Sequence, residues 1–579
     1  MENNRRLLLA IALTVLVIVA TQFLFPTPPA PAKRPGATAD SIAAAQPGQP
    51  APAGAAATPA PGAPGAPGVP AVAGVAGDTT AAGTPAVGAA TPALPVETAL
   101  VAGSRAAYAV SSAGGALVGA EMRNYQTLAP GTQGSAQLAR RGEPLLSYRL
   151  VVPGDTIALA RTPMRATRAG GTVQLQGTAT SRLGQSIPVS ITYGFAPDNY
   201  TLQVRGTAGV TGPAFLLVDM PATIAPTEKD TLDHYNHLAY AWKPQNDDAS
   251  SVAFGKLDPG ERELIAGPLT WAVAKSKYFI LGVLAPNGQQ FSELSITGGV
   301  RGAKVATHAQ GTVVVPLTNG GFAFDGYAGP QEWRRLVAMG REFETSNPYG
   351  GWLQGIVQPF ATIVIRLILW MHDALRLSYG AVLIALGVLV RLLLWPLQQN
   401  AMRSQIRMQR VQPELQAIQQ KYKNDPQRLQ VEMMRVYKEH DVSPFAMLTG
   451  CLPMLLPMPI FFALFFVFQN TIEFRGVEWF YLPDLSLKDP YYIMPVLVAG
   501  TSFLLSWIGM RAAPPNPQTQ MITYMMPAMF LFFFLNVASG LNLYYLVQNL
   551  VALPQQWLLA RERSKSAPPL VQGTPLKRA

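Results

Sequence analysis

One apolar stretch constrains the fold of this chain more than any other feature. Residues 380–397 read GAVLIALGVLVRLLLWPL, and Arg391 is their only ionisable side chain. At a helical rise of about 1.5 Å per residue, the stretch is long enough to cross the hydrocarbon core of a bilayer. An arginine at the centre of a membrane helix costs roughly 2.5–3.5 kcal/mol on insertion scales, so something must offset that cost.

Two interpretations of Arg391 are open from its position alone. The side chain can snorkel, because Trp395 and Pro396 mark the interfacial end of the stretch only one or two turns away. Alternatively, the guanidinium faces a watery cavity within a helical bundle. The rest of the chain has to decide between them.

The composition is that of a membrane protein with a soluble part. Hydrophobic residues make up 49% of the 579 residues and charged residues only 13%. The net charge of +11 suits nucleic acid, but no RNA- or DNA-binding motif occurs, and the basic clusters flank apolar runs as in cytoplasmic loops. We therefore expect no sequence-specific nucleic-acid partner. The single cysteine, Cys451, allows no disulfide within the chain.

The first 95 residues predict an anchor followed by a linker. Arg5 and Arg6 precede an apolar run at 7–25 that lacks a clear small-x-small cleavage site. We expect residues 1–25 to form an uncleaved transmembrane anchor with a cytoplasmic N-terminus; a cleaved signal peptide is the alternative. Residues 26–95 are almost entirely Ala, Pro, Gly, Thr and Val, which predicts a disordered linker.

Residues 96–343 carry strand signals. The segments at 172–176 and 200–204 alternate apolar and polar residues, as half-buried strands do. Turn-forming pairs such as Pro153-Gly154 separate such segments. We expect an antiparallel β-sandwich of two packed sheets, on the periplasmic side. His234 and His237 have no acidic or cysteine partner at convincing spacing, so we expect no metal site there.

Residues 344–378 predict an amphipathic helix beside the membrane. Gln354, Gln358, Thr362 and Arg366 recur every four positions, and Asp373 follows seven residues later. They form one polar stripe on an otherwise apolar helix at 355–376. Such a helix lies in the membrane interface rather than across it. A span that contains a charge is the alternative, and we disfavour it because it would reverse the topology downstream.

Further apolar runs, together with the anchor, predict six transmembrane helices in one α-helical bundle. After the anchor, the core at 379–563 has spans at about 380–397, 447–468, 491–510, 521–537 and 541–559. A basic tail follows at 564–579, and counting spans places it in the cytoplasm.

Between the first two core spans, residues 398–443 predict a cytoplasmic helical hairpin. Asn424-Asp425-Pro426 separates its arms, and Pro413 should kink or divide the first arm. The hairpin is either a solvated charged element or a docking surface. The basic residues that would dock a partner are Arg403, Arg407, Arg410, Lys421, Lys423, Arg435 and Lys438.

Three prolines in one span suggest a path through the membrane. Pro453, Pro457 and Pro459 remove backbone donors and loosen the helix at 447–468. Large apolar side chains on a span usually only contact lipid, but the prolines together with Arg391 favour a path.

Six motifs, in order, resemble the YidC/Oxa/Alb family of membrane protein insertases. They lie at 391–396 (RLLLWP), 412–416 (QPELQ), 421–426 (KYKNDP), 450–460, 489–492 (DPYY) and 540–545 (GLNLYY). The linker and the sandwich resemble, more loosely, the extra periplasmic domain of the Gram-negative branch. Pro457 departs from the family, which commonly has Gln at that position.

The resemblance implies an insertase and chaperone rather than an enzyme. It would move hydrophobic segments of nascent proteins from the cytoplasm into the bacterial inner membrane, through a hydrophilic groove open to lipid. Arg391 would be the groove charge. The implied substrate-contact residues are Pro453, Met454, Met458, Ile460, Phe461, Pro527, Phe530, Phe533, Phe534, Tyr544 and Tyr545.

The same resemblance implies the partners. They are nascent membrane proteins, the ribosome, the Sec translocon and the phospholipid bilayer, with no cofactor or metal. Two other functions stay open. One is a secondary transporter of a small solute, although no internal repeat is found. The other is a membrane-anchored carbohydrate-binding protein, although no acid/base pair stands out.

Overall fold

The computed structural model describes residues 96–302, 305–349, 353–423, 425–439, 458–511 and 517–566. The anchor and linker predicted at 1–95, the contact residues Pro453 and Met454, and most of the predicted tail lie outside these residues. So do the side chains of Arg403, Arg407, Arg410, Pro413 and Met458.

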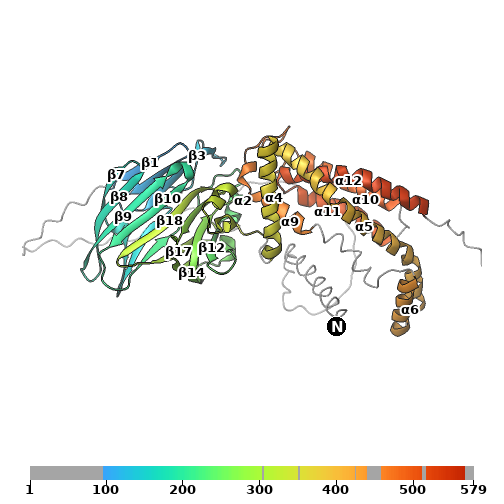
Figure 1. Ribbon diagram of the computed structural model, residues 1–579, viewed down its shortest axis with the longest axis horizontal. Helices are drawn as coiled ribbons and strands as arrows, with labels where there is room; N and C mark the ends of the chain where they lie inside the picture. The colour runs from blue at the N-terminus through green and yellow to red at the C-terminus, as the bar shows by residue number, and fades with distance from the viewer. Residues whose placement is uncertain are drawn as a thin grey trace, which may run out of the picture. The chain divides into compact units, whose positions relative to one another are not determined.

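The N-terminal part of the described chain is an antiparallel β-sandwich, as predicted (Figure 1). A four-stranded sheet has the order β1-β2-β3-β4. A 14-stranded sheet has the order β6-β5-β11-β17-β16-β14-β15-β18-β10-β9-β8-β7, with β12 paired to β13 and β14 beside this path. The strands are β1 Thr98–Ala102, β2 Ala106–Ser111, β3 Leu117–Gln126, β4 Ser135–Gln137, β5 Ser147–Val152, β6 Asp155–Ala158, β7 Met164–Ala169, β8 Thr172–Thr180, β9 Ser186–Ala196, β10 Thr201–Ala208, β11 Phe215–Asp219, β12 Ala239–Pro244, β13 Ser250–Ala253, β14 Arg262–Lys275, β15 Phe279–Leu284, β16 Phe291–Gly298, β17 Ala309–Pro316 and β18 Gly321–Pro330.

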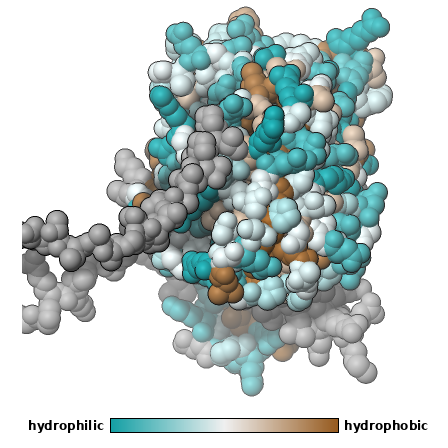
Figure 2. Space-filling model, turned by 90° about the vertical axis from the view of Figure 1, so that its left-hand side faces the viewer, coloured by the Kyte–Doolittle hydropathy of each residue, from teal (hydrophilic) through white to brown (hydrophobic). Residues whose placement is uncertain are grey.

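The alternation in the sequence produces the sandwich core. In β8, Val173 and Leu175 are fully buried while their neighbours are exposed, and they pair with Tyr193 and Ile191 of β9. The smaller sheet shares this core, because the Tyr108 hydroxyl of β2 donates to the carbonyl of Ala328 at 2.9 Å. By contrast, hydrophilic side chains dominate the face of the sandwich seen in Figure 2. This face is suited to water.

In the part of the chain that the structure describes, seven longer helices follow the sandwich. They are α4 Gln354–Leu375, α5 Tyr379–Lys421, α6 Pro426–Glu439, α9 Met458–Asn470, α10 Ile493–Arg511, α11 Pro517–Phe534 and α12 Ser539–Ser566. Within the described residues, three segments are long and apolar enough to cross a membrane, namely Gln354–Leu375, Tyr379–Pro396 and Ile493–Met510. Ile460–Asn470 and Tyr524–Phe534 are shorter apolar helices. The count of six spans therefore stays a prediction.

The polar stripe of α4 contacts the segment that leaves the sandwich. The Arg366 guanidinium lies 5.2 Å from the ring centre of Trp333, in helix α3 (Trp333–Ala338). Asp373 forms an ion pair with Arg334 of the same helix. The stripe is therefore partly covered by protein, and the interfacial position of α4 stays a prediction, since α4 is also long enough to span.

Helix α5 joins the first core span to the first hairpin arm without a break. Pro413 was expected to kink or divide this arm, and division is wrong, because α5 runs from Tyr379 to Lys421. The kink stays a prediction. A proline removes one backbone donor, and the helix-forming residues on both sides carry the helix past it. The predicted stop and restart agree with the described helices, since α5 ends at Lys421 and α6 begins at Pro426. The Asp425 side chain accepts from the Arg428 amide at 3.1 Å and caps α6.

The two arms of the hairpin pack against each other. Val411 and Leu415 of α5 form a small buried cluster with Val436 and Tyr437 of α6. The helical hairpin is thus present in the fold. Its location in the cytoplasm remains a prediction.

A buried ion pair joins the sandwich to the loop between α9 and α10. Arg475 Nε lies 3.0 Å from the Glu228 carboxylate, and the two side chains are only 5% and 4% exposed. Arg475 also donates to the carbonyls of Gln126 and Thr227, and Ile472 belongs to the core of the sandwich. The sandwich is therefore fixed to this loop by more than the chain connection.

The same loop ties the starts of α10 and α12 together. The Asp484 carboxylate accepts from the Gly476 amide at 2.9 Å, and the Asp484 carbonyl accepts from the Ser539 hydroxyl at 2.9 Å. The Asp489 carboxylate accepts from the Met494 amide at 2.7 Å. The loop thus sets the spacing of helices that continue into the candidate site.

Candidate functional site

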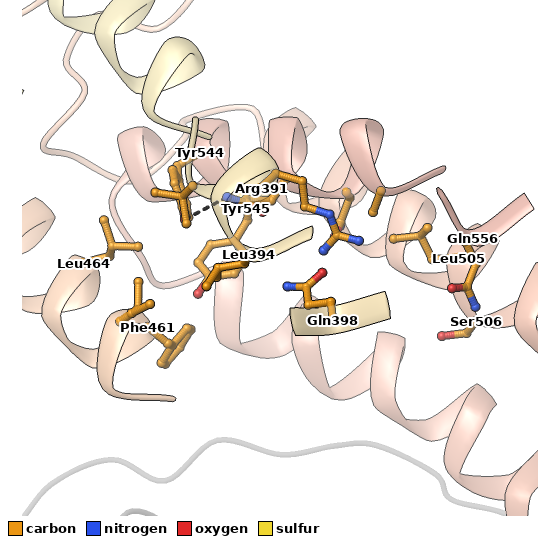
Figure 3. A pocket seen from close by; sticks show the side chains of 15 residues that line it. Arg391, Leu394, Gln398, Phe461, Leu464, Leu505, Ser506, Tyr544, Tyr545 and Gln556 are labelled. Carbon is orange, nitrogen blue, oxygen red and sulfur yellow. Dashed lines mark hydrogen bonds between the residues drawn. The ribbon is translucent and has the colours of Figure 1, made fainter. Parts of the chain in front are cut away.

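A pocket of about 370 Å³ lies among α5, α9, α10 and α12 (Figure 3). It has room for on the order of ten water molecules, each of which takes about 30 Å³ in the liquid. Its wall is apolar on the α9 side and polar along α5 and α12. The lining residues are Val390, Arg391, Leu394, Gln398, Ile460, Phe461, Leu464, Leu505, Ser506, Tyr544, Tyr545, Gln548, Asn549, Ala552 and Gln556.

Arg391 is the cation of this pocket. Its Nη2 donates to Oε1 of Gln555 on α12 at 2.8 Å. Gln555 is 2% exposed, and Arg391 Nε is buried without a hydrogen-bond partner among the described residues. No described carboxylate forms an ion pair with Arg391. The guanidinium is oriented by a neutral amide, so its charge is not cancelled by the protein around it.

Amides on α12 hold the neighbouring helices around the pocket. Gln548 Nε2 donates to the Gly387 carbonyl of α5 at 2.8 Å and to the Tyr544 hydroxyl at 2.9 Å. Asn549 Nδ2 donates to the Ser502 hydroxyl of α10 at 2.8 Å. These bonds connect α5 and α10 through α12, and they satisfy polar groups that lipid could not.

Sequence reasoning missed Gln555 as a partner of Arg391. Gln548 and Gln555 are seven residues apart, which places them on one face of a helix, two turns from each other. Gly387 and Arg391, the groups they contact, are likewise one turn apart on α5. A second glutamine on the Gln548 face of this helix was the signal available in the sequence.

The predicted substrate-contact residues fall into two groups. Ile460, Phe461, Tyr544 and Tyr545 line the pocket together with Arg391. The others that are described lie behind this wall or inside α11.

Aromatic rings form the layer behind the pocket wall. The Phe461 ring centre lies 5.8 Å from that of Phe533 and 5.6 Å from that of Tyr545. Phe534 lies 5.2 Å from Tyr545 and 6.2 Å from Phe530. Phe534 is 2% exposed, so a passing substrate could touch it only after the helices move. Pro527 is buried inside α11.

The described basic residues of the hairpin differ in whether their charge is balanced by an ion pair. Lys421, Lys423 and Lys438 are exposed. Arg435 forms ion pairs with Glu432 at 3.2 Å and Glu439 at 3.3 Å, so part of its charge is balanced on α6 itself.

The two histidines of the sandwich are engaged in hydrogen bonds. A ring nitrogen of His234 lies 3.0 Å from the Ile224 carbonyl, and His237 Nδ1 lies 2.7 Å from the Asp233 carbonyl. Burial lowers the pKa of both rings. Within the described part of the chain, no group of three His, Cys, Asp or Glu side chains could hold a metal ion.

The comparison with known proteins agrees with the two-part architecture. Residues 94–363 match the family model of the YidC periplasmic domain, and residues 370–566 match that of the 60Kd inner membrane protein. The membrane protein insertase YidC of Chlorobium phaeovibrioides is 31% identical over 423 residues, which cover 67% of this chain and 71% of that protein. The chain belongs to the YidC insertase family. The YidC of Syntrophus aciditrophicus is 32% identical over 343 residues, or 58% of this chain.

The match with some YidC relatives covers less than two thirds of their length, for example 60% for the Syntrophus protein. A solved structure described as an active YidC insertase with its first transmembrane domain resolved aligns with 80% of this chain and 95% of its own. The TM-score of 0.32 and identity of 17% are too low to transfer any position.

Proposed function

We propose that this protein inserts hydrophobic segments of nascent proteins into the bacterial inner membrane, using the pocket around Arg391 as a groove for their polar tails. The observation that carries this proposal is a guanidinium within an apolar helix, bonded to the neutral Gln555 and lining a pocket that is polar along α12 and apolar along α9. A snorkelling arginine would need neither the pocket nor the buried acceptor.

The energetics support a role for this charge. Two opposite charges 4 Å apart attract by about 4 kcal/mol at an effective dielectric constant of about 20. An aspartate at the centre of a membrane helix costs roughly 2.5–3.5 kcal/mol. One arginine can therefore offset the cost of drawing one acidic residue of a substrate tail into the membrane.

The aromatic side of the pocket supplies the apolar half of the path. Phe461 and Tyr545 line it, with further rings behind them. A substrate segment that leaves this wall for lipid gains about 0.8 kcal/mol for each methylene removed from water. No nucleotide needs to be hydrolysed for such a transfer.

The contacts of the loop between α9 and α10 support the proposed topology. This loop joins the sandwich to the starts of α10 and α12, and Trp479 in it packs against Gly380 at the start of α5. If the sandwich is periplasmic, the hairpin at the far end of α5 and the C-terminal end of α12 lie in the cytoplasm. There the exposed lysines of the hairpin would dock the ribosome, and the Sec translocon would be a further partner.

The experiment that tests this proposal is complementation of cells depleted of their own insertase. Matched substrates with acidic or neutral tails are followed at equal levels of wild type, Arg391→Ala and Arg391→Lys. We expect Arg391→Ala to impair acidic tails most and Arg391→Lys to keep much of the activity. Arg376→Gln, at an exposed position outside the pocket, is the control. Equal insertion of both substrates by Arg391→Ala would remove the role of the charge, and failure of wild type to complement would remove the function.

A further inference from the structure

The loop between α9 and α10 contains a tight turn with an exposed aromatic ring at its tip. The amides of Trp479 and Leu482 each donate to the other residue's carbonyl at 2.9 Å, which closes the turn around Phe480. Phe480 is 95% exposed and has a φ of 57°. This left-handed conformation costs a non-glycine residue roughly 1–2 kcal/mol. A strained position that holds a phenylalanine away from the protein calls for a function.

The turn is held firmly at the level of the helix starts. A Cβ added to Gly380, in the first turn of α5, would clash with the indole of Trp479. The Tyr481 hydroxyl donates to the Asp489 carboxylate at 2.8 Å, and the same carboxylate accepts from the Met494 amide at the start of α10. The height of the Phe480 ring relative to α5 and α10 is therefore fixed.

Phe480 belongs to a larger exposed apolar surface. Tyr491 is 69% exposed, and Tyr492 is 51% exposed and also has a φ of 57°. The Tyr481 ring lies 5.9 Å from Phe480 and 6.3 Å from Tyr491, which links the two parts of the surface.

The surface continues onto α10. Ile493, Val496 and Leu497 are 44%, 57% and 44% exposed along its first turns. This helix is long and apolar enough to cross a membrane. A surface that begins with aromatic rings and runs into an exposed helix flank matches the arrangement of side chains at a membrane boundary.

We propose that Phe480, Tyr491 and Tyr492 form an interfacial anchor that binds the lipid headgroup region on the sandwich side of the membrane. Tyrosine suits this region because its ring is apolar and its hydroxyl is wet. Lys488, an exposed cation in the same loop, is available to lipid phosphates. Lipid is the occupant because the surface is continuous with the exposed flank of α10, where a bilayer would lie.

The anchor has a consequence for the whole external part of the protein. The loop that carries Phe480 also carries Arg475, which is bound to Glu228 of the sandwich. A loop fixed in depth by lipid would therefore also fix the sandwich at a set height above the membrane. This consequence does not depend on the insertase activity.

The test places a fluorescent probe at position 480 of the full-length chain. Cys451, the only cysteine, is replaced by serine, and a single cysteine at 480 is labelled with an environment-sensitive dye. The protein is reconstituted in vesicles of phosphatidylethanolamine and phosphatidylglycerol. Leu183, which is 79% exposed in the β8–β9 turn, provides the control site.

We expect spin-labelled lipid headgroups to quench the probe at 480 several-fold more than the probe at 183. Acrylamide in the water should show the opposite order. Equal quenching of the two probes by lipid would overturn the proposal.

A second pair of variants separates lipid binding from folding. Phe480→Gly and Phe480→Asn relieve the left-handed strain, so the melting temperature in detergent should be unchanged or higher. A probe at Tyr491 in vesicles should then become several-fold more accessible to acrylamide. A clear drop in melting temperature would show that Phe480 serves the protein fold, and unchanged accessibility at 491 would show that Phe480 does not hold this surface in the membrane.

Discussion

Replacing Arg475 with methionine should remove the cation of a buried ion pair while keeping much of its apolar stem. The variant leaves the Glu228 carboxylate 4% exposed and without its ion-pair partner, with the charge of Lys277 still acting on it. It also removes the donor to the carbonyls of Gln126 and Thr227. Breaking a buried pair by removing one partner costs about 3–5 kcal/mol, because a buried charge is left uncompensated. We expect a loss of this size in the free energy of unfolding of the sandwich.

The loss should depend on pH. Burial raises the pKa of Glu228, and Arg475 opposes that shift. Without Arg475 the pKa of Glu228 rises further, so the folded chain takes up a proton more readily than the unfolded chain. Stability then falls as pH rises from the unfolded pKa towards the folded one. We therefore expect the penalty of Arg475→Met to be smaller at pH 5 than at pH 8.

The assay is thermal and denaturant unfolding of the full-length protein in detergent, followed through the transition of the sandwich. For a domain of this size, each kcal/mol lowers the melting temperature by about 2–4 °C, so a drop of about ten degrees is expected. Arg182→Met is the matched control. Arg182 is 89% exposed in its ion pair with Asp155, and such surface pairs contribute about 0–1 kcal/mol.

A double variant distinguishes the charge effect from simple loss of packing. Glu228→Leu with Arg475→Met removes both charges, and apolar replacement of a buried pair is often neutral or stabilising. The double variant should therefore be clearly more stable than Arg475→Met alone. If Arg475→Met behaves like Arg182→Met, or if the double variant is the least stable of all, the description of this contact is wrong.

Three further predictions follow from single contacts. Gln555→Leu removes the acceptor of Arg391, and insertion of acidic-tailed substrates should fall roughly tenfold, since a hydrogen bond to a charged group contributes about 1.5–3 kcal/mol. Substrates with neutral tails are the control, and an equal loss of insertion for both would refute an orienting role for Gln555. Burial raises the pKa of Glu473 to about 7, so stability should decline from about pH 4.5 to pH 7. Glu473→Gln should therefore be more stable than wild type at pH 8 by up to about 3 kcal/mol. The same dependence of stability on pH in both proteins would contradict this. Gly380→Val forces a side chain into the Trp479 ring and should lower the melting temperature, whereas Gly355→Val, in open space, should not.

Local patterns in the sequence predicted much of the fold. The alternation at 172–176 gave a strand because Val173 and Leu175 point into one core. The break at 424–426 was predicted because Asp425 can cap a helix and Pro426 suits its first turn. Both signals depend on the properties of a few neighbouring residues, so the sequence alone is enough to recognise them.

Contacts between distant segments could not be predicted in this way. Glu228 and Arg475 are 247 positions apart, and neither stands in a pattern that marks a partner. Arg391 was singled out by its isolation, but its acceptor Gln555 lies 164 positions away on another helix. Phe534 was predicted to touch substrates, and only packing against Tyr545 shows that it is buried. Tertiary packing, not local chemistry, determines these features.

The central claim is that substrate segments pass along the pocket around Arg391, and crosslinking tests it most directly. A photoreactive residue is placed at Phe461 or Tyr545 in the pocket, or at Leu550, which is 47% exposed on α12 outside the pocket. Ribosome-bound chains of increasing length then present an apolar segment with an acidic tail. We predict strong crosslinks from 461 and 545 as the segment emerges, and weak ones from 550. Efficient insertion with no crosslink from either pocket position, or with equal crosslinks from all three, would contradict the account.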